Sequence, residues 1–118
     1  MQELKDLVFR LLAVDAISGF EEPMMRALVE ELTPYCDEVY DTPRGNIIGI
    51  QKGTDPDAPG IALAAHTDQV GFIVFNIDES GFIRFRKVGG SVTRSIQAHQ
   101  MKLHGTKGVV PGVAGIKP

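Results

Sequence analysis

Apolar residues near the start of the chain recur with the period of an α-helix. Leucines and one valine at positions 4, 7, 8, 11 and 12 share one face of a helix over residues 3–14. A second apolar stripe, through positions 25, 28, 29 and 32, ends before Pro34. Ser18 and Glu21 have the Ser-x-x-Glu spacing of a capping box, which marks the N-terminus of a helix. We therefore predict two amphipathic helices, the second capped by Ser18.

The hydrophobic period changes after the second helix. Residues 39–40, 46–51 and 61–65 are short runs of β-branched or wholly apolar character, separated by loops that contain Gly and Pro. The run at 61–65, Ile-Ala-Leu-Ala-Ala, has no polar alternation. This composition predicts a strand buried on both faces inside a helix-covered sheet, and hence an α/β fold.

From residue 70 onward the pattern predicts β-structure only. Residues 70–77 and 82–88 are two strand-like runs joined by the turn-like sequence Asp-Glu-Ser-Gly, which predicts a β-hairpin. Residues 100–104 and 109–114 flank a second turn and predict two more short strands. No helix of convincing length is expected in this half.

Composition and charge limit the classes of function. The 118 residues carry a net charge of −3, which gives no concentrated positive surface for nucleic acid or an anionic membrane. The single cysteine, Cys36, cannot form an internal disulfide, and we expect it to be a buried structural thiol rather than a nucleophile. The N-terminus has no basic, apolar signal sequence. A cytoplasmic protein is the resulting expectation.

His66 and Asp68 are the most informative polar residues. They follow the apolar run at 61–65, and side chains two apart project to the same side of an extended segment. A neutral imidazole at a strand end can bind a divalent metal while a nearby carboxylate fixes its orientation. The alternative is a hydrogen-bonded pair that merely ends a strand. The other histidines, His99 and His104, have no acidic residues at metal-ligand spacing, so no complete site is visible.

Six short blocks, in order and at matching spacing, resemble the family of dinuclear glutamyl aminopeptidases and tetrahedral aminopeptidases. The resemblance covers essentially the whole chain, through SGFEE (residues 18–22), TPRGN (42–46), AHTDQVGF (65–72), GFIRF (81–85), VGG (88–90) and GVAGIKP (112–118). It implies that His66 is a ligand of one metal ion and that Asp68 orients this histidine. In such enzymes two zinc or cobalt ions activate a water molecule that hydrolyses the peptide bond beside a free N-terminus.

The resemblance also implies a domain organisation and partners. Residues 1–69 would be the first part of a zinc-peptidase-like α/β sandwich, and residues 70–118 the first part of an inserted all-β, barrel-like domain used for subunit association. The expected partners are peptide substrates and further copies of the chain. Family members are about three times as long, and the bridging aspartate, the general-base glutamate and the remaining ligands lie later in their sequences.

Two departures from the family pattern affect the prediction. Thr67 and Gln69 stand where the family commonly has Met and Glu, which leaves the preferred substrate residue open. The ending at Pro118 leads us to expect a fragment or the product of a truncated gene, with weak or no metal binding and no activity alone. The alternatives are a non-catalytic remnant that serves as a self-association module, and a free-standing small binding domain. Unpaired strand edges predict self-association or poor solubility.

Overall fold

The computed structural model describes residues 1–90 and 93–115, and its first part confirms the two predicted helices. Helix α1 spans Gln2–Leu12 and helix α2 spans Glu22–Leu32. A short 3-10 turn, η1, follows at Thr33–Tyr35 and contains Pro34, whose ring cannot continue the α-helical hydrogen bonding. None of the helices in the described part of the chain is long and apolar enough to cross a membrane. Residues 116–118, the end of the last family block, lie outside the described residues.

The strands among the described residues form three separate antiparallel pairs. They are β1 (Glu38–Asp41) with β2 (Ile47–Ile50), β3 (Gly71–Ile77) with β4 (Ile83–Val88), and β5 (Gln100–Gly105) with β6 (Gly108–Val113). The β3–β4 pair is the predicted hairpin, and β5 and β6 are the two further short strands predicted on either side of a turn. A 3-10 turn, η2 (Thr93–Ile96), connects them. The described chain is thus a small α/β unit made of local elements.

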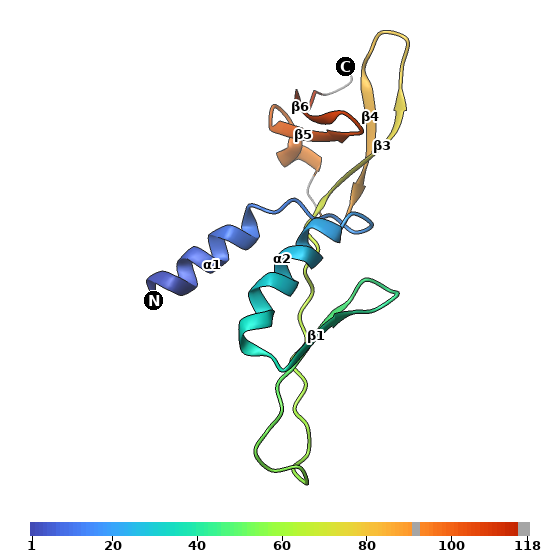
Figure 1. Cartoon of the computed structure of the whole chain (residues 1–118). Coiled ribbons are helices and arrows are strands. Elements are labelled where there is room, and N and C mark those ends of the chain that lie inside the picture. The colour runs from blue at the N-terminus through green and yellow to red at the C-terminus, as the bar shows by residue number, and fades with distance from the viewer. Residues whose placement is uncertain (91–92, 116–118) are drawn as a thin grey trace.

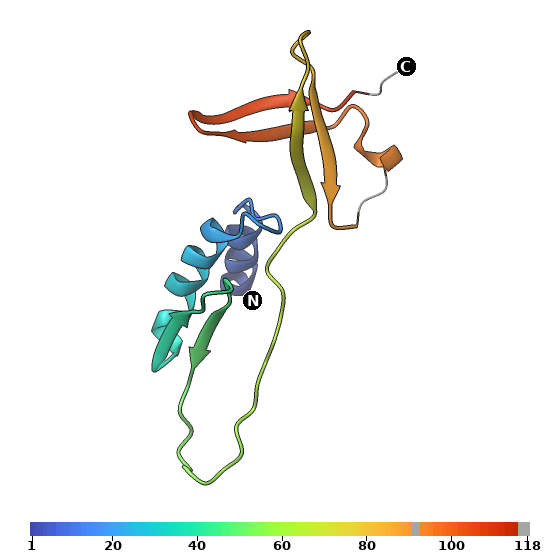
Figure 2. The same ribbon diagram turned by 90° about the vertical axis from the view of Figure 1, so that its right-hand side faces the viewer.

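The elements are spread along an elongated molecule. Its extents are 64 × 34 × 28 Å, and its radius of gyration of 18.8 Å exceeds the roughly 13–14 Å of a compact domain of this length. In Figures 1 and 2, the helices and β1–β2 lie together, the connection over residues 51–70 extends below them and returns, and the other two hairpins lie above. Helix α2 packs on β1 and β2.

The predicted buried strand at residues 61–65 is wrong for this structure. These residues form no strand, and the side chains of Ile61 and Leu63 are 90% and 95% exposed. The physical reason is that a strand needs a hydrogen-bonded neighbour, and none of the described segments runs beside this one (Figure 2). The parallel, helix-covered sheet expected from the apolar run is therefore not among the described elements.

Burial is sparse throughout the described residues. The buried apolar side chains among them are Ala16, Met24 and Ala114. Helix α1 buries no side chain fully, although its apolar stripe is the one that the sequence predicts. Ala16 lies in the connection between the two helices, at the point where the chain meets the start of β3. Ala16, the most buried of the three, therefore marks a packed junction that adjoins the candidate site.

Candidate metal-binding site

The structure brings the side chains of His66 and Asp68 together. Nδ1 of His66 lies 3.1 Å from Oδ1 of Asp68 and 3.2 Å from the backbone oxygen of the same residue. An ionised carboxylate and a carbonyl oxygen are acceptors only, so the ring nitrogen that faces them must carry the proton. The other nitrogen, Nε2, then keeps a lone pair. The imidazole side chain is 86% exposed, so this lone pair is open to a ligand.

Ser18 holds the other oxygen of the Asp68 carboxylate. Its hydroxyl donates to Oδ2 over 2.6 Å, a length typical of a hydrogen bond to an ionised acceptor. This bond is the main cause that lowers the pKa of Asp68. The bond from His66 lowers the pKa further, and partial desolvation acts in the opposite direction. The carboxylate is therefore ionised at neutral pH, with one partner on each oxygen.

The role predicted for Ser18 as a helix cap is wrong. Helix α2 begins at Glu22, its N-cap is Glu21, and no side chain caps it. The carboxylate of Glu21 accepts instead from the backbone N–H of Gly19 at 2.8 Å. The physical reason is competition for the hydroxyl, because a bond to a carboxylate is stronger than one to a neutral backbone group. Within the block at residues 18–22, Ser18 thus contacts Asp68, whereas Glu21 and Glu22 form the start of the helix.

The α1–α2 connection, residues 13–21, is fixed against the segment just before β3. The backbone N–H of Gln69 donates to the oxygen of Ala16 at 2.6 Å, and Ile17 pairs with Gln69 in a parallel bridge. Gly71 lies directly under the side chain of Ile17, where a Cβ atom would come closer than 3.0 Å to it. The absence of a side chain at position 71 is what allows this close approach.

A second polar cluster, which the sequence did not predict, joins the α1–α2 connection to β5. Asp15 accepts from Nζ of Lys102 at 2.9 and 3.0 Å, and Nε2 of His104 lies 3.2 Å from the same carboxylate. The ring of Phe20 lies against that of His104, with 5.3 Å between ring centroids. The sequence separation of 87 residues hides this contact from any local spacing rule. His104 therefore has an acidic companion in Asp15, although no acidic residue stands at metal-ligand spacing from it in the sequence.

The described residues contain one exposed donor that a metal ion could use. Nε2 of His66 is a nitrogen donor of the kind that zinc and cobalt accept. Over residues 1–90 and 93–115, however, no group of three or more His, Cys, Asp or Glu side chains lies close enough to hold an ion. His99 is remote from His66 in sequence, and its Nδ1 faces the backbone oxygen of Gln97. The donor present fits the implied metal as one ligand of an incomplete set.

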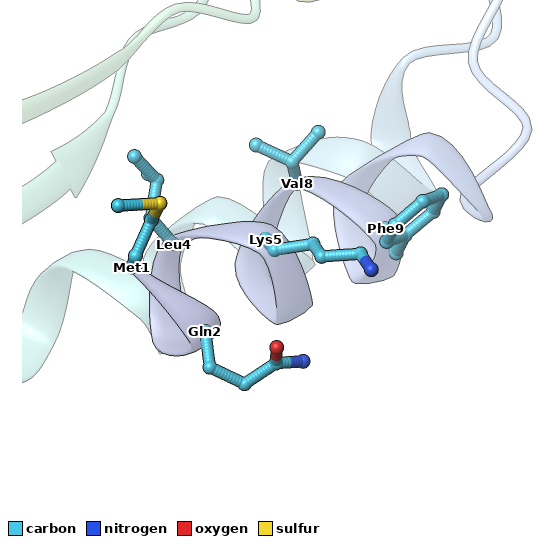
Figure 3. A pocket seen from close by; sticks show the side chains of 6 residues that line it. All are labelled: Met1, Gln2, Leu4, Lys5, Val8 and Phe9. Atoms are coloured by element: carbon cyan, nitrogen blue, oxygen red, sulfur yellow. The ribbon is translucent and has the colours of Figure 1, made fainter.

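Two other features carry no candidate chemistry. Cys36 is half-buried rather than buried, and its Sγ packs against Gly49 at a position where a Cβ atom would lie 2.8 Å away. A shallow depression of about 570 Å³ runs along α1 (Figure 3) and contains no His, Cys or acidic side chain. Its lining consists of Met1, Gln2, Leu4, Lys5, Val8 and Phe9.

Comparison with protein-family models identifies a family that this chain matches. The family model for M42 glutamyl aminopeptidase matches residues 45–118, more than half of the chain. The match includes His66 and Asp68 and both hairpins of the second half. Residues 15–21 precede the matched region.

Individual relatives agree with the family model. Lysyl aminopeptidase of Pyrococcus furiosus is 32% identical over 114 residues, which are 96% of this chain and 32% of that protein. The crystal structure of a TET aminopeptidase from a marine sediment archaeon has a TM-score of 0.90 at 33% identity, over 100% of this chain and 33% of its own. The TET1 peptidase of Pyrococcus horikoshii, described as assembling into a tetrahedron or a large octahedral shell, has a TM-score of 0.80 at 27% identity, over 96% of this chain and 33% of its own. The chain thus spans about a third of the length of these relatives.

Proposed function

The chain belongs to the M42 glutamyl aminopeptidase family, and from this premise we propose that it is the N-terminal part of a metal-dependent aminopeptidase. The observation that carries the proposal is the orientation of His66. Its Nδ1 faces the Asp68 carboxylate, so its exposed Nε2 is free to bind a metal ion. A carboxylate that fixes the tautomer of a histidine ligand in this way is a common support of metal sites.

Each residue has a distinct role in this proposal. His66 binds one metal ion through Nε2, and Asp68 keeps the ring in the required tautomer and orientation. Two zinc or cobalt ions, when bound, supply Lewis acidity and lower the pKa of the water that attacks the peptide carbonyl. The substrates are peptides with a free N-terminus. We expect the enzyme to act in the cytoplasm. The other ligands and the general base belong to a part of the enzyme not contained in this chain.

The two halves of the chain would serve different parts of that enzyme. We assign residues 1–69 to the catalytic α/β domain and residues 70–118 to an inserted β domain that is barrel-like when complete. The apolar, exposed segment at 61–65 would then pair with strands of the catalytic sheet, which explains its composition. The described hairpins are consistent with the start of a β insert.

The first test is the reading frame. A continuation that encodes an Asp, a Glu-Glu pair, an Asp and a His in series supports the enzyme, whereas a stop codon directly after Pro118 contradicts it. In the longer protein, His66→Ala should lower the zinc content from two ions to one per chain. It should also reduce hydrolysis of an aminoacyl-p-nitroanilide by at least about a hundredfold, since changes in outer-shell residues alone cost 10–100-fold.

The matched control is His99→Ala. The side chain of His99 faces only a backbone oxygen, so its removal should leave zinc content and activity unchanged. Equal loss in both variants would contradict the assignment of His66. For the 118-residue chain alone we expect no zinc binding tighter than about 1 μM in calorimetry and no hydrolysis.

A second candidate function is self-association through the β hairpins. Their surfaces expose several large apolar side chains, each more than half accessible: Ile73, Phe75, Phe82, Val110 and Val113. Exposed apolar patches of this kind mark interfaces between proteins. We expect the chain to elute as an oligomer in size exclusion with light scattering, and Ile73→Lys to shift it toward the monomer. Leu63→Lys, at a side chain that is even more accessible but lies in the 51–70 connection, is the control.

A further inference from the structure

The Asp68 carboxylate has two oxygens, and each has a different partner. Oδ1 faces Nδ1 of His66 at 3.1 Å, and Oδ2 accepts from the hydroxyl of Ser18 at 2.6 Å. A carboxylate held at one oxygen only can rotate about its terminal torsion, which is broad. With Oδ2 held by Ser18, that rotation is restricted, and Oδ1 stays directed at the imidazole.

Contacts of three nearby residues restrict the backbone around Ser18. The backbone bridge between Ile17 and Gln69 fixes the residue before it. The bond from the N–H of Gly19 to Glu21 fixes the residue after it, where the chain turns through a φ of 90°. Farther back, Asp15 is paired with Lys102 of β5. The Ser18 side chain is short and its backbone is constrained, so its hydroxyl has little freedom. The α1–α2 connection therefore sets the position of Oδ2 of Asp68.

The helix that follows does not need this hydroxyl. The N-cap position is Glu21, and the backbone of Met25 bonds to that residue rather than to Ser18. The bond to Asp68 is therefore the one interaction of the Ser18 side chain that the described residues provide. Its removal should affect the carboxylate and leave helix α2 in place.

We propose that Ser18 is a positioning residue of the metal site: through Asp68 it keeps His66 in the tautomer with the proton on Nδ1 and with Nε2 free for the metal. The inference rests on the proposed role of His66 as a ligand. On this inference the α1–α2 connection orients His66, although the connection precedes the matched family region.

The test is the tautomer of His66, measured by long-range 15N–1H NMR on the 118-residue chain. The pH is set at about 8.5, where an ordinary imidazole with a pKa of about 6.5 is neutral. Wild type should show the proton of His66 on Nδ1. His104 provides an internal reference for the opposite tautomer, because its Nε2 faces Asp15.

Three variants give the expected pattern. Ser18→Ala should move the tautomer ratio of His66 toward the one measured in Asp68→Ala, in which the carboxylate is absent. Ser18→Thr keeps the hydroxyl and should restore the wild-type ratio. The matched control is Ser80→Ala, at the turn between β3 and β4, which should leave the ratio unchanged. A wild-type ratio in Ser18→Ala, or an alanine-like ratio in Ser18→Thr, would overturn the inference.

Folding is monitored through the amide of Gln69, which bonds to Ala16 beside the site. If Ser18→Ala loses this protection, Ser18→Cys replaces it, because a thiol is similar in size and only a weak donor. The tautomer ratio of His66 is then measured in Ser18→Cys, where a shift toward the ratio of Asp68→Ala supports the inference and a wild-type ratio overturns it.

Metal binding separates this inference from the proposed function. In the longer protein, Ser18→Ala should weaken zinc affinity by roughly tenfold, the lower end of the 10–100-fold range for outer-shell residues. If His66→Ala leaves zinc binding unchanged, the ligand assignment fails while the tautomer of Ser18→Ala still tests the positioning. If His66→Ala abolishes binding but Ser18→Ala changes neither tautomer nor affinity, only the inference fails.

Discussion

Replacement of Gly71 by alanine should open the junction between the α1–α2 connection and β3. A Cβ atom at this position would lie less than 3.0 Å from Cγ2 of Ile17 and 3.2 Å from its Cβ. The isoleucine cannot escape by rotation, because it is branched at Cβ and another carbon would take the vacated place. Its backbone is also bridged to Gln69. The two segments must therefore separate, at the cost of about 1–3 kcal/mol that overpacking typically carries.

The assay is hydrogen exchange of the Gln69 amide, which donates to Ala16 across this junction. With about 1.4 kcal/mol per factor of ten, the expected loss of protection is roughly 5- to 150-fold. Ile17→Ala removes the obstructing methyl group and should restore most of the protection in the double variant. Gly60→Ala is the control, because a Cβ atom there meets nothing within 4 Å. Equal protection in Gly71→Ala and Gly60→Ala, or an unprotected amide in wild type, would refute the reasoning.

Three further predictions concern other parts of the chain. The N–H of Phe82 is the main cause that lowers the pKa of Asp78, so the stabilising effect of this carboxylate is present above pH 3.8 and is lost as the pH falls through the lowered pKa. Protection of the Phe82 amide, relative to its intrinsic exchange rate, should fall in this acid range in wild type but not in Asp78→Asn. Glu31→Gln should change the unfolding free energy in urea by less than about 1 kcal/mol, because its pair with Arg10 is at the surface. Leu63→Lys should leave unfolding of this chain within about 0.5 kcal/mol, because the side chain is 95% exposed, but should destabilise a longer form in which the segment joins a sheet.

Elements whose contacts are local could be predicted from the sequence. The two helices follow from the 3.6-residue period, and β3–β4 and β5–β6 follow from strand-like runs on either side of a tight turn. His66 and Asp68 are two residues apart, and their contact was expected from that spacing. The site roles assigned to them remain predictions.

Features that depend on distant residues could not be predicted. The run at residues 61–65 has the composition of a central strand, but composition does not supply the neighbouring strands that would pair with it. Ser18 has the spacing of a helix cap, and only the three-dimensional structure reveals the carboxylate 50 residues away that takes its hydroxyl. Lys102 and Asp15 carry no motif that would link them across 87 residues.

These separations also set an order of events as the chain is synthesised. The contacts among helices α1 and α2 and the β1–β2 pair fall within the first 50 residues, so these elements can form once about 50 residues have left the ribosome. The bond from Ser18 to Asp68 must wait for the strand-forming segment after the 51–70 connection, and the tie from Asp15 to Lys102 waits longer still. Closure of such loops costs entropy that grows with the logarithm of their length. The bond that directs the Asp68 carboxylate at His66 can therefore form only after the chain has closed a loop of 50 residues.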